Sequence, residues 1–186
     1  MAHNQTENEI KLAVPDLKFA RRKLHEAGFT ISKRRVFESN VVFDTPRLTL
    51  RTASKLLRLR MVGKETIVTF KGKPAIARHK SREELELNVE NAATIGAIFE
   101  RLGFRPVFRY EKYRTEYRQQ RGGGVATLDE TPVGLYLELE GTPPWVDRTA
   151  HRMGFTEQDY ITASYGRLYL DWCRKHRVKA SNMVFG

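Results

Sequence analysis

Apolar and charged residues alternate along many short stretches of this chain, and a period of two is typical of half-buried β-strands. Residues 7–12, ENEIKL, place Glu7, Glu9 and Lys11 on one face and aliphatic residues on the other. The same alternation, with Gly, Pro and Thr between the segments, predicts further strands. The predicted strands lie near 6–12, 36–45, 55–62, 65–72, 81–89, 107–119, 125–130 and 134–140.

Apolar residues recur with a period of 3.6 in four other stretches, which favours helices. Asp16 caps the first predicted helix, which ends at Gly28. Asn91 caps the second, which ends at Gly103. The two remaining helices are predicted over 143–154 and 164–176.

Seven of the predicted strands carry aliphatic or aromatic side chains on one face and charged side chains on the other. The aliphatic faces need a cover, and the amphipathic helices are available for it. If helices cover the outside, the charged faces converge inside a closed barrel, whose interior has room for side chains or one small ligand. We therefore predict an α+β fold: an eight-stranded antiparallel closed β-barrel with helices packed on the outside, formed by one domain over residues 1–186.

Composition limits the class of protein and of partner. Of the 186 residues 40% are hydrophobic and 30% charged, which is ordinary for a globular protein. No apolar run approaches the ~20 residues that span a bilayer, and the first residues lack a signal-peptide pattern. The single Cys173 excludes a disulfide framework and a cysteine-based zinc site. We expect a cytoplasmic protein without a membrane role, and the net charge of +11 indicates a polyanionic partner.

The charged positions of the strands form a nearly balanced set. The bases are Lys11, Arg58, Arg60, Lys71, Arg82, Lys112 and Arg114, and the acids are Glu7, Glu9, Glu84, Glu86, Asp129, Glu138 and Glu140. Because acids and bases cluster on different strands, we expect them to neutralise one another only in part. Strands that carry only bases can grip phosphates. In strands that carry two acids, the two carboxylates repel each other unless a hard cation such as Mg²⁺ or Mn²⁺ lies between them.

Two other interpretations compete with this one. An open sheet with a solvated polar face is the ordinary explanation of any single strand, but the almost wholly ionic character of seven strands favours a ligand. A non-catalytic binder of polyphosphate or nucleic acid needs a basic outer groove with exposed aromatic residues. Tyr113 and Tyr117 lie on the face assigned to helix packing, and the paired acids stay unexplained, so a nucleic-acid partner is disfavoured.

The motifs resemble those of the CYTH superfamily, the triphosphate tunnel metalloenzymes. ENEIK (7–11) fits E-x-E-x-K, and the others follow in family order: FDT (43–45), LRLR (57–60), TFKG (69–72), R-x-E-x-E (82–86), K-x-R-x-x-Y (112–117), LDE (128–130), G-x-Y-x-E-x-E (134–140) and SY (164–165). The wording is most similar to the branch labelled class IV adenylate cyclase. Val42 and Tyr136 depart from the commonest pattern, in which Tyr and Phe stand there.

The resemblance implies a role for each member of the ionic set. Triphosphate is bound by Lys11, Arg58, Arg60, Lys71 and Arg114, with Arg82 and Lys112 as further contributors. Mg²⁺ or Mn²⁺ is held by Glu7, Glu9, Glu138 and Glu140, with Asp129 completing the shell. Glu84 and Glu86 orient metal-bound water or basic side chains. The resemblance implies a catalytic set formed by Glu7, Glu9 and the seven bases named above.

The implied activity is conversion of ATP to cyclic AMP and pyrophosphate. A triphosphatase acting on inorganic triphosphate, thiamine triphosphate or a nucleoside triphosphate shares this equipment, and the sequence leaves the choice open. It also leaves open a homodimer and the role of the tail 178–186. The histidines lack metal-ligand spacing and are expected at the surface, and the basic loop 77–82 is expected to be solvated.

Overall fold

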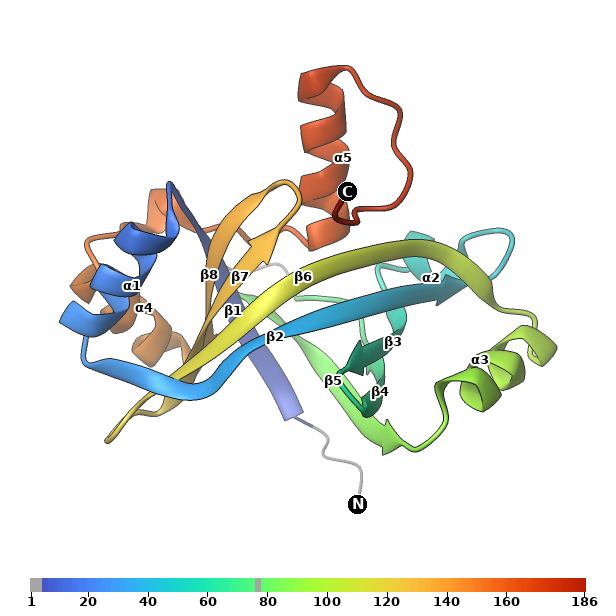
Figure 1. Cartoon of the computed structure of the whole chain (residues 1–186), viewed down its shortest axis with the longest axis horizontal. Coiled ribbons are helices and arrows are strands. Elements are labelled where there is room, and N and C mark those ends of the chain that lie inside the picture. Colours follow the sequence, from blue (N-terminus) through green and yellow to red (C-terminus); the bar gives the residue numbers. More distant parts are fainter. Residues whose placement is uncertain (1–4, 76–77) are drawn as a thin grey trace.

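A closed antiparallel barrel is the centre of the fold (Figure 1). The computed structural model describes residues 5–75 and 78–186, with side chains from residue 8 onward. Within them eight strands close into a ring in the order β1-β5-β4-β3-β2-β6-β7-β8. The strands are β1 (Gln5–Val14), β2 (Phe29–Asp44), β3 (Leu56–Val62), β4 (Glu65–Lys71), β5 (Lys80–Val89), β6 (Arg105–Gln119), β7 (Gly124–Thr131) and β8 (Gly134–Gly141). The predicted α+β barrel is confirmed.

Three of the described helices lie between strands in the sequence and the others follow β8, and the predicted caps Asp16 and Asn91 are present. They are α1 (Leu17–Glu26), α2 (Thr49–Thr52), α3 (Ala92–Arg101), α4 (Pro143–Arg152), the 3₁₀ helix η1 (Glu157–Asp159) and α5 (Tyr165–His176). The Asp16 carboxylate accepts a hydrogen bond from the Phe19 backbone N–H at 2.7 Å. The described helices include none that is both long and apolar enough to cross a membrane.

Two elements differ from the expectation. Strand β2 begins at Phe29 rather than near residue 36, because it pairs with β6 from Phe29 opposite Gln119 to Asp44 opposite Arg105. Helix α2 has no apolar repeat that could have revealed it. Both oxygens of the Asp44 carboxylate accept backbone N–H groups at its start, each at 2.9 Å.

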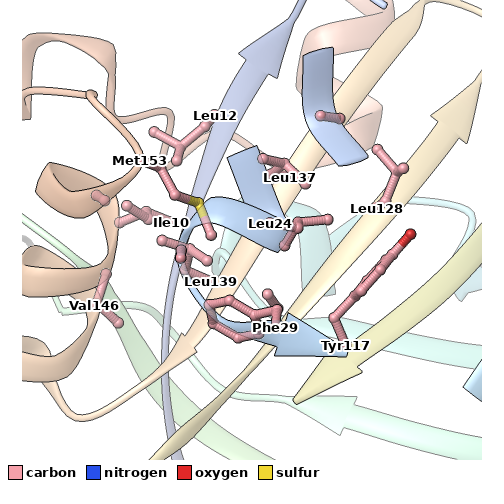
Figure 2. Packing of buried hydrophobic residues seen from close by; sticks show 14 of the residues in the cluster. Ile10, Leu12, Leu24, Phe29, Tyr117, Leu128, Leu137, Leu139, Val146 and Met153 are labelled. Atoms are coloured by element: carbon pink, nitrogen blue, oxygen red, sulfur yellow. The ribbon is translucent and has the colours of Figure 1, made fainter. Parts of the chain in front are cut away.

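The largest hydrophobic cluster lies between the outer faces of β1, β7 and β8 and the helices α1 and α4 (Figure 2). Leu12 and Leu137 come from the barrel, Leu24 from α1 and Val146 from α4. Since successive side chains of a strand point to opposite faces, burying these residues outside directs the charged positions inward. A smaller cluster joins α3 to the outer faces of β2 and β3.

Helix α5 differs from the predicted arrangement, because it lies at one end of the barrel rather than along its side (Figure 1). Tyr165 and Tyr169 of α5 belong to an aromatic cluster with the inward-facing Tyr110 and Tyr136. We call this set, together with Phe108, the aromatic plug. The cluster also contains the buried side chain of Cys173.

The C-terminal tail runs beside β6 and holds α5 in place. Met183 donates its backbone N–H to the Arg109 carbonyl at 2.9 Å and accepts from the Glu111 N–H at 2.8 Å. The side chain of Met183 is buried in the same cluster as the plug. The tail is therefore an integral part of the fold at this end of the barrel.

We predict that Leu137→Ala lowers the free energy of unfolding by about 2–5 kcal/mol, because a fully buried leucine leaves a cavity. Urea denaturation measures the change. Leu87→Ala is the matched control, since its side chain is 62% exposed and loses less than about 0.5 kcal/mol. Equal losses in both variants would contradict the assignment of the core to the outer faces of β1, β7 and β8.

Candidate functional site

The predicted ionic residues converge on the inside of the barrel. Lys11 on β1 stands opposite Glu138 on β8, and Arg114 on β6 stands opposite Asp129 on β7. Salt bridges connect inward side chains from all eight strands. The side chain of Glu7 lies outside the described part of the structure, and its backbone pairs with Arg82, which is half-buried.

Asp129 is the centre of the first ionic group. Its carboxylate is fully buried and accepts from Lys112 Nζ at 2.8 Å and from two nitrogens of Arg114 at 2.7 and 2.6 Å. The hydroxyl of Tyr165 donates to Oδ2 at 2.6 Å. Burial and the carboxylates of Asp129 and Glu138 raise the pKa of Tyr165 well above its usual value, so the hydroxyl keeps its proton.

Glu9 and Glu138 share Lys11. The ammonium of Lys11 lies 3.4 Å from Glu9 and 3.1 Å from Glu138. Lys80 also contacts Glu9, and Arg114 also contacts Glu138. Burial raises the pKa of each carboxyl, but Lys11 and the other nearby bases outweigh burial and hold both pKa values well below the usual range. Both carboxylates are therefore ionised.

The second ionic group surrounds Arg58. Its guanidinium donates to the Tyr110 hydroxyl at 3.1 Å, to Thr69 at 3.0 Å and to Glu86 at 3.4 Å. Glu84 lies 3.0 Å from Lys71 and 3.9 Å from Arg58. The structure thus places both predicted supporting acids next to predicted phosphate-binding bases.

Glu38 connects the bases of β3 and β6, and the sequence analysis did not single it out. Its carboxylate lies 3.6 Å from Arg60 and 3.5 Å from Lys112. Burial raises the pKa of Glu38, but Lys112 and Arg60 outweigh it and lower the pKa to about 2. The alternation of β2 offered the signal, since Glu38 and Asn40 occupy the inward positions. The residues of the bore that sequence reasoning missed are Glu38, Asn40, Lys80 and Tyr110, together with any role for Tyr165.

We expected the acids and bases of the inner face to neutralise one another only in part, and for most of these residues that expectation was wrong. Each described acid of the bore for which a contact is seen pairs with a base from another strand, as Asp129 on β7 does with Lys112 on β6. Closing the barrel brings acid-bearing strands beside base-bearing ones. Because the interior of a protein screens charge weakly, these pairs largely offset one another.

Comparison with known proteins identifies the fold and the family. The CYTH domain family matches residues 5–164. This chain belongs to the CYTH family. A Methanocaldococcus jannaschii protein named "Putative adenylate cyclase" is 31% identical over 135 residues, which are 72% of this chain and 75% of that protein.

Solved structures share the CYTH barrel of this chain. A "putative adenylate cyclase" from Vibrio parahaemolyticus has a TM-score of 0.75 at 19% identity, and the match covers 89% of this chain and 98% of that chain. A Hippeastrum protein described as a "putative adenylyl cyclase" with a dominant triphosphatase activity has a TM-score of 0.67 at 20% identity. That match covers 89% of this chain and 95% of the other. At these identities the likeness establishes the fold.

The acids of this CYTH barrel fit a hard divalent cation by their chemistry. Glu9 and Glu138 face one ammonium from neighbouring strands, and Glu140 stands in register with Glu9. Carboxylate oxygens suit Mg²⁺ and Mn²⁺. Glu140 is exposed, however, and within residues 5–75 and 78–186 no three metal-ligating side chains already lie together. The metal assignments of these acids and of Asp129 stay predictions.

The basic segment 78–82 is only partly solvated, because Arg78 is exposed but Lys80 is buried, and His79 is not a surface residue. His79 is 6% exposed, and its Nε2 lies 2.7 Å from the Asp147 carboxylate on α4. Arg78 donates to the same carboxylate at 2.6 Å, and the Tyr160 hydroxyl donates to it at 3.1 Å. Asp147 thus fastens the start of β5, and with it Lys80, to the outer helix layer.

Tyr113 lies on the outer face of β6 as expected, but the expected helix cover is corrected. Its ring packs against Phe37 of β2 and Phe185 of the C-terminal tail and under the guanidinium of Arg35. Tyr117 does pack in the cluster under α1, as expected. An outer face of β6 is therefore covered by the C-terminal tail instead of a helix.

We predict that the stabilising contribution of the ionised Glu38 carboxylate is lost in acid. A carboxyl whose folded pKa is about 2, against a usual 4.5, stabilises the fold above pH 4.5. That contribution, roughly 3 kcal/mol, is lost as the pH falls from 4.5 towards 2. The difference in unfolding free energy between wild type and Glu38→Gln should shrink over this range in urea titrations. A difference that stays constant with pH would contradict the ion pairs assigned to Glu38.

Proposed function

We propose that this CYTH protein is a metal-dependent enzyme that acts on a triphosphate held in the bore, with conversion of ATP to cyclic AMP and pyrophosphate as its leading activity. The observation that carries the proposal is the convergence of bases on one enclosed space. The bases that contact acids within the bore include Lys11, Arg58, Arg60, Lys71, Lys80, Lys112 and Arg114.

Binding of a triphosphate exchanges the partners of these bases. Phosphate oxygens take over contacts that the carboxylates make in the free protein, since a guanidinium or ammonium group binds either anion. The carboxylates released by Lys11 are those of Glu9 and Glu138. They would hold Mg²⁺ or Mn²⁺ together with Glu140 and Glu7, and a divalent ion supplies further stabilisation of charge on the phosphate oxygens.

The residues of the bore act mainly by position and charge. Arg58, Lys112 and Arg114 stabilise the negative charge that grows on the phosphate oxygens in the transition state. In a cyclase the ribose 3′-hydroxyl attacks the α-phosphorus and pyrophosphate leaves. The name of the relative from Methanocaldococcus jannaschii supports this activity.

A triphosphatase is the second candidate, and the aromatic plug favours it. Tyr110, Tyr136 and Tyr165 are buried against one another at one end of the bore. The adenine and ribose of ATP would therefore have to occupy the opposite end of the bore. Inorganic triphosphate has no nucleoside to accommodate. The description of the Hippeastrum protein supports the same candidate.

Product identification separates the candidates. The full chain is incubated with ATP, thiamine triphosphate and inorganic triphosphate, each with Mg²⁺, with Mn²⁺ and with a chelator. Cyclic AMP with pyrophosphate indicates the cyclase, and orthophosphate release indicates the triphosphatase. Turnover that persists under chelation overturns the metal requirement. Absence of turnover and of binding with all three substrates overturns the proposal.

We predict that Glu9→Gln and Glu138→Gln each reduce turnover by at least about 100-fold, because a neutral amide holds a divalent ion poorly. Circular dichroism should show an intact fold. Glu26→Gln is the matched control, since Glu26 lies exposed on α1 and pairs with Arg22 and Lys23 of the same helix. Full activity in either bore variant would remove the metal assignment.

We predict that Arg58→Ala raises the KM for the triphosphate substrate by about tenfold or more, because a charge-assisted contact to phosphate is lost. Steady-state kinetics measures the effect. Arg22→Ala on the exposed face of α1 is the matched control and should leave KM and kcat unchanged. An unchanged KM and kcat in Arg58→Ala would exclude this guanidinium from the substrate site.

A further inference from the structure

The segment that precedes α5 is fixed to β1 at Lys11. The backbone N–H of Lys11 donates to the Ile161 carbonyl, and the Ile161 N–H donates to the Lys11 carbonyl, both at 2.9 Å. The Ser164 side chain accepts from the Arg167 N–H and begins the helix directly before Tyr165. These contacts place the first residue of α5 beside one of the bases of the bore.

The side chain of Tyr165 reaches three charged groups of the bore at once. Its hydroxyl donates to Asp129 Oδ2 at 2.6 Å. Its ring centroid lies 5.2 Å from Lys11 Nζ and 5.1 Å from Lys112 Nζ. A phenol offers a proton to the acid and a ring face to the ammonium groups, so both contacts are favourable.

We propose that Tyr165 is a positioning residue for the triphosphate-binding bases and acts through Asp129. This inference rests on the proposed function. Asp129 holds Lys112 and Arg114 through both of its oxygens. A hydroxyl that donates to Oδ2 fixes the rotation of the Asp129 carboxylate, so the carboxylate holds Lys112 and Arg114 in one position. The hydroxyl also satisfies part of the negative charge, so the carboxylate attracts the two bases less strongly and leaves them available to phosphate.

The rest of α5 is anchored independently of Tyr165. The Ser181 backbone N–H donates to the Tyr169 hydroxyl at 3.1 Å, and the tail pairs with β6 at Met183. Removing one hydroxyl at the start of the helix should therefore leave the helix in place. Tyr169 offers a matched control, because it lies on the same helix and both tyrosines are 7% exposed.

This role differs from the metal-ligand role that the sequence predicts for Asp129. A carboxylate whose oxygens accept from Lys112, Arg114 and Tyr165 controls the bases, and its loss should weaken triphosphate binding even without a divalent ion. A metal ligand should matter only when the metal is present. The two roles therefore predict different outcomes in metal-free buffer.

Calorimetric titration of the full chain with inorganic tripolyphosphate in chelator tests the inference. Tyr165→Phe keeps the ring and removes the hydroxyl, and we expect binding to weaken by roughly tenfold, the size of a hydrogen bond to a charged group. Tyr169→Phe should bind within about twofold of wild type. Adding Tyr165→Phe to Asp129→Asn should bring no further loss, because residues that act as a unit are not additive.

Each other outcome overturns the inference. Wild-type binding by Tyr165→Phe removes the role of the hydroxyl, and equal weakening in both tyrosine variants shows only a structural role for α5. A Tyr165→Phe variant that changes only the Mg²⁺ concentration needed for turnover returns Asp129 to the metal shell. Wild type that binds tripolyphosphate with Mg²⁺ but not in chelator also overturns the inference, because the bases alone then do not hold the triphosphate. If wild type binds it under neither condition, the proposed function fails, and the inference that rests on it fails as well.

Discussion

Buried charge has to be paired, and this requirement governs the whole barrel. Lys11 and Lys112 are almost fully buried, and an isolated ion in such a place costs several kcal/mol. Each of these two ammonium groups is matched by a carboxylate of a neighbouring strand, Glu138 for Lys11 and Asp129 for Lys112. The pairs form only if the strands meet in one register and the barrel closes. The ionic interior and the closed topology therefore depend on each other.

The same pairing connects stability to the proposed function. The carboxylates that offset the bases in the free protein are the groups proposed to hold a cation, and the bases are those proposed to grip a triphosphate. Ligand binding is then an exchange of partners between charges that are already buried and ionised. The charges of the bore are already in position, so they need not reorganise during the reaction as water dipoles must. Preorganised charges of this kind are usually the largest source of transition-state stabilisation in enzymes.

The bore differs from one end to the other, and its two ends are built by segments distant in sequence. At one end α5 and the C-terminal tail bury the aromatic plug against β6 and β8. Elsewhere Asp147 of α4 fastens the residues that lead into β5, including the buried His79. Both sets of contacts fix side chains of the bore from outside the barrel. The contacts of α5 and the tail fix Tyr165, and those of Asp147 fix Lys80.

Local patterns in the sequence determined the strands, the helix caps and the ionic character of the inner face. A period of two and a capping residue such as Asp16 act over a few neighbouring residues, so they can be read along the chain. Pairing partners could not be read in this way. Glu9 meets Lys80 across 71 positions, and Asp129 meets Tyr165 across 36. Such contacts exist only once strand order, register and closure are set, and those properties come from the packing of the entire chain. The tertiary structure alone therefore decided which charges neutralise one another and which residues hold them in place.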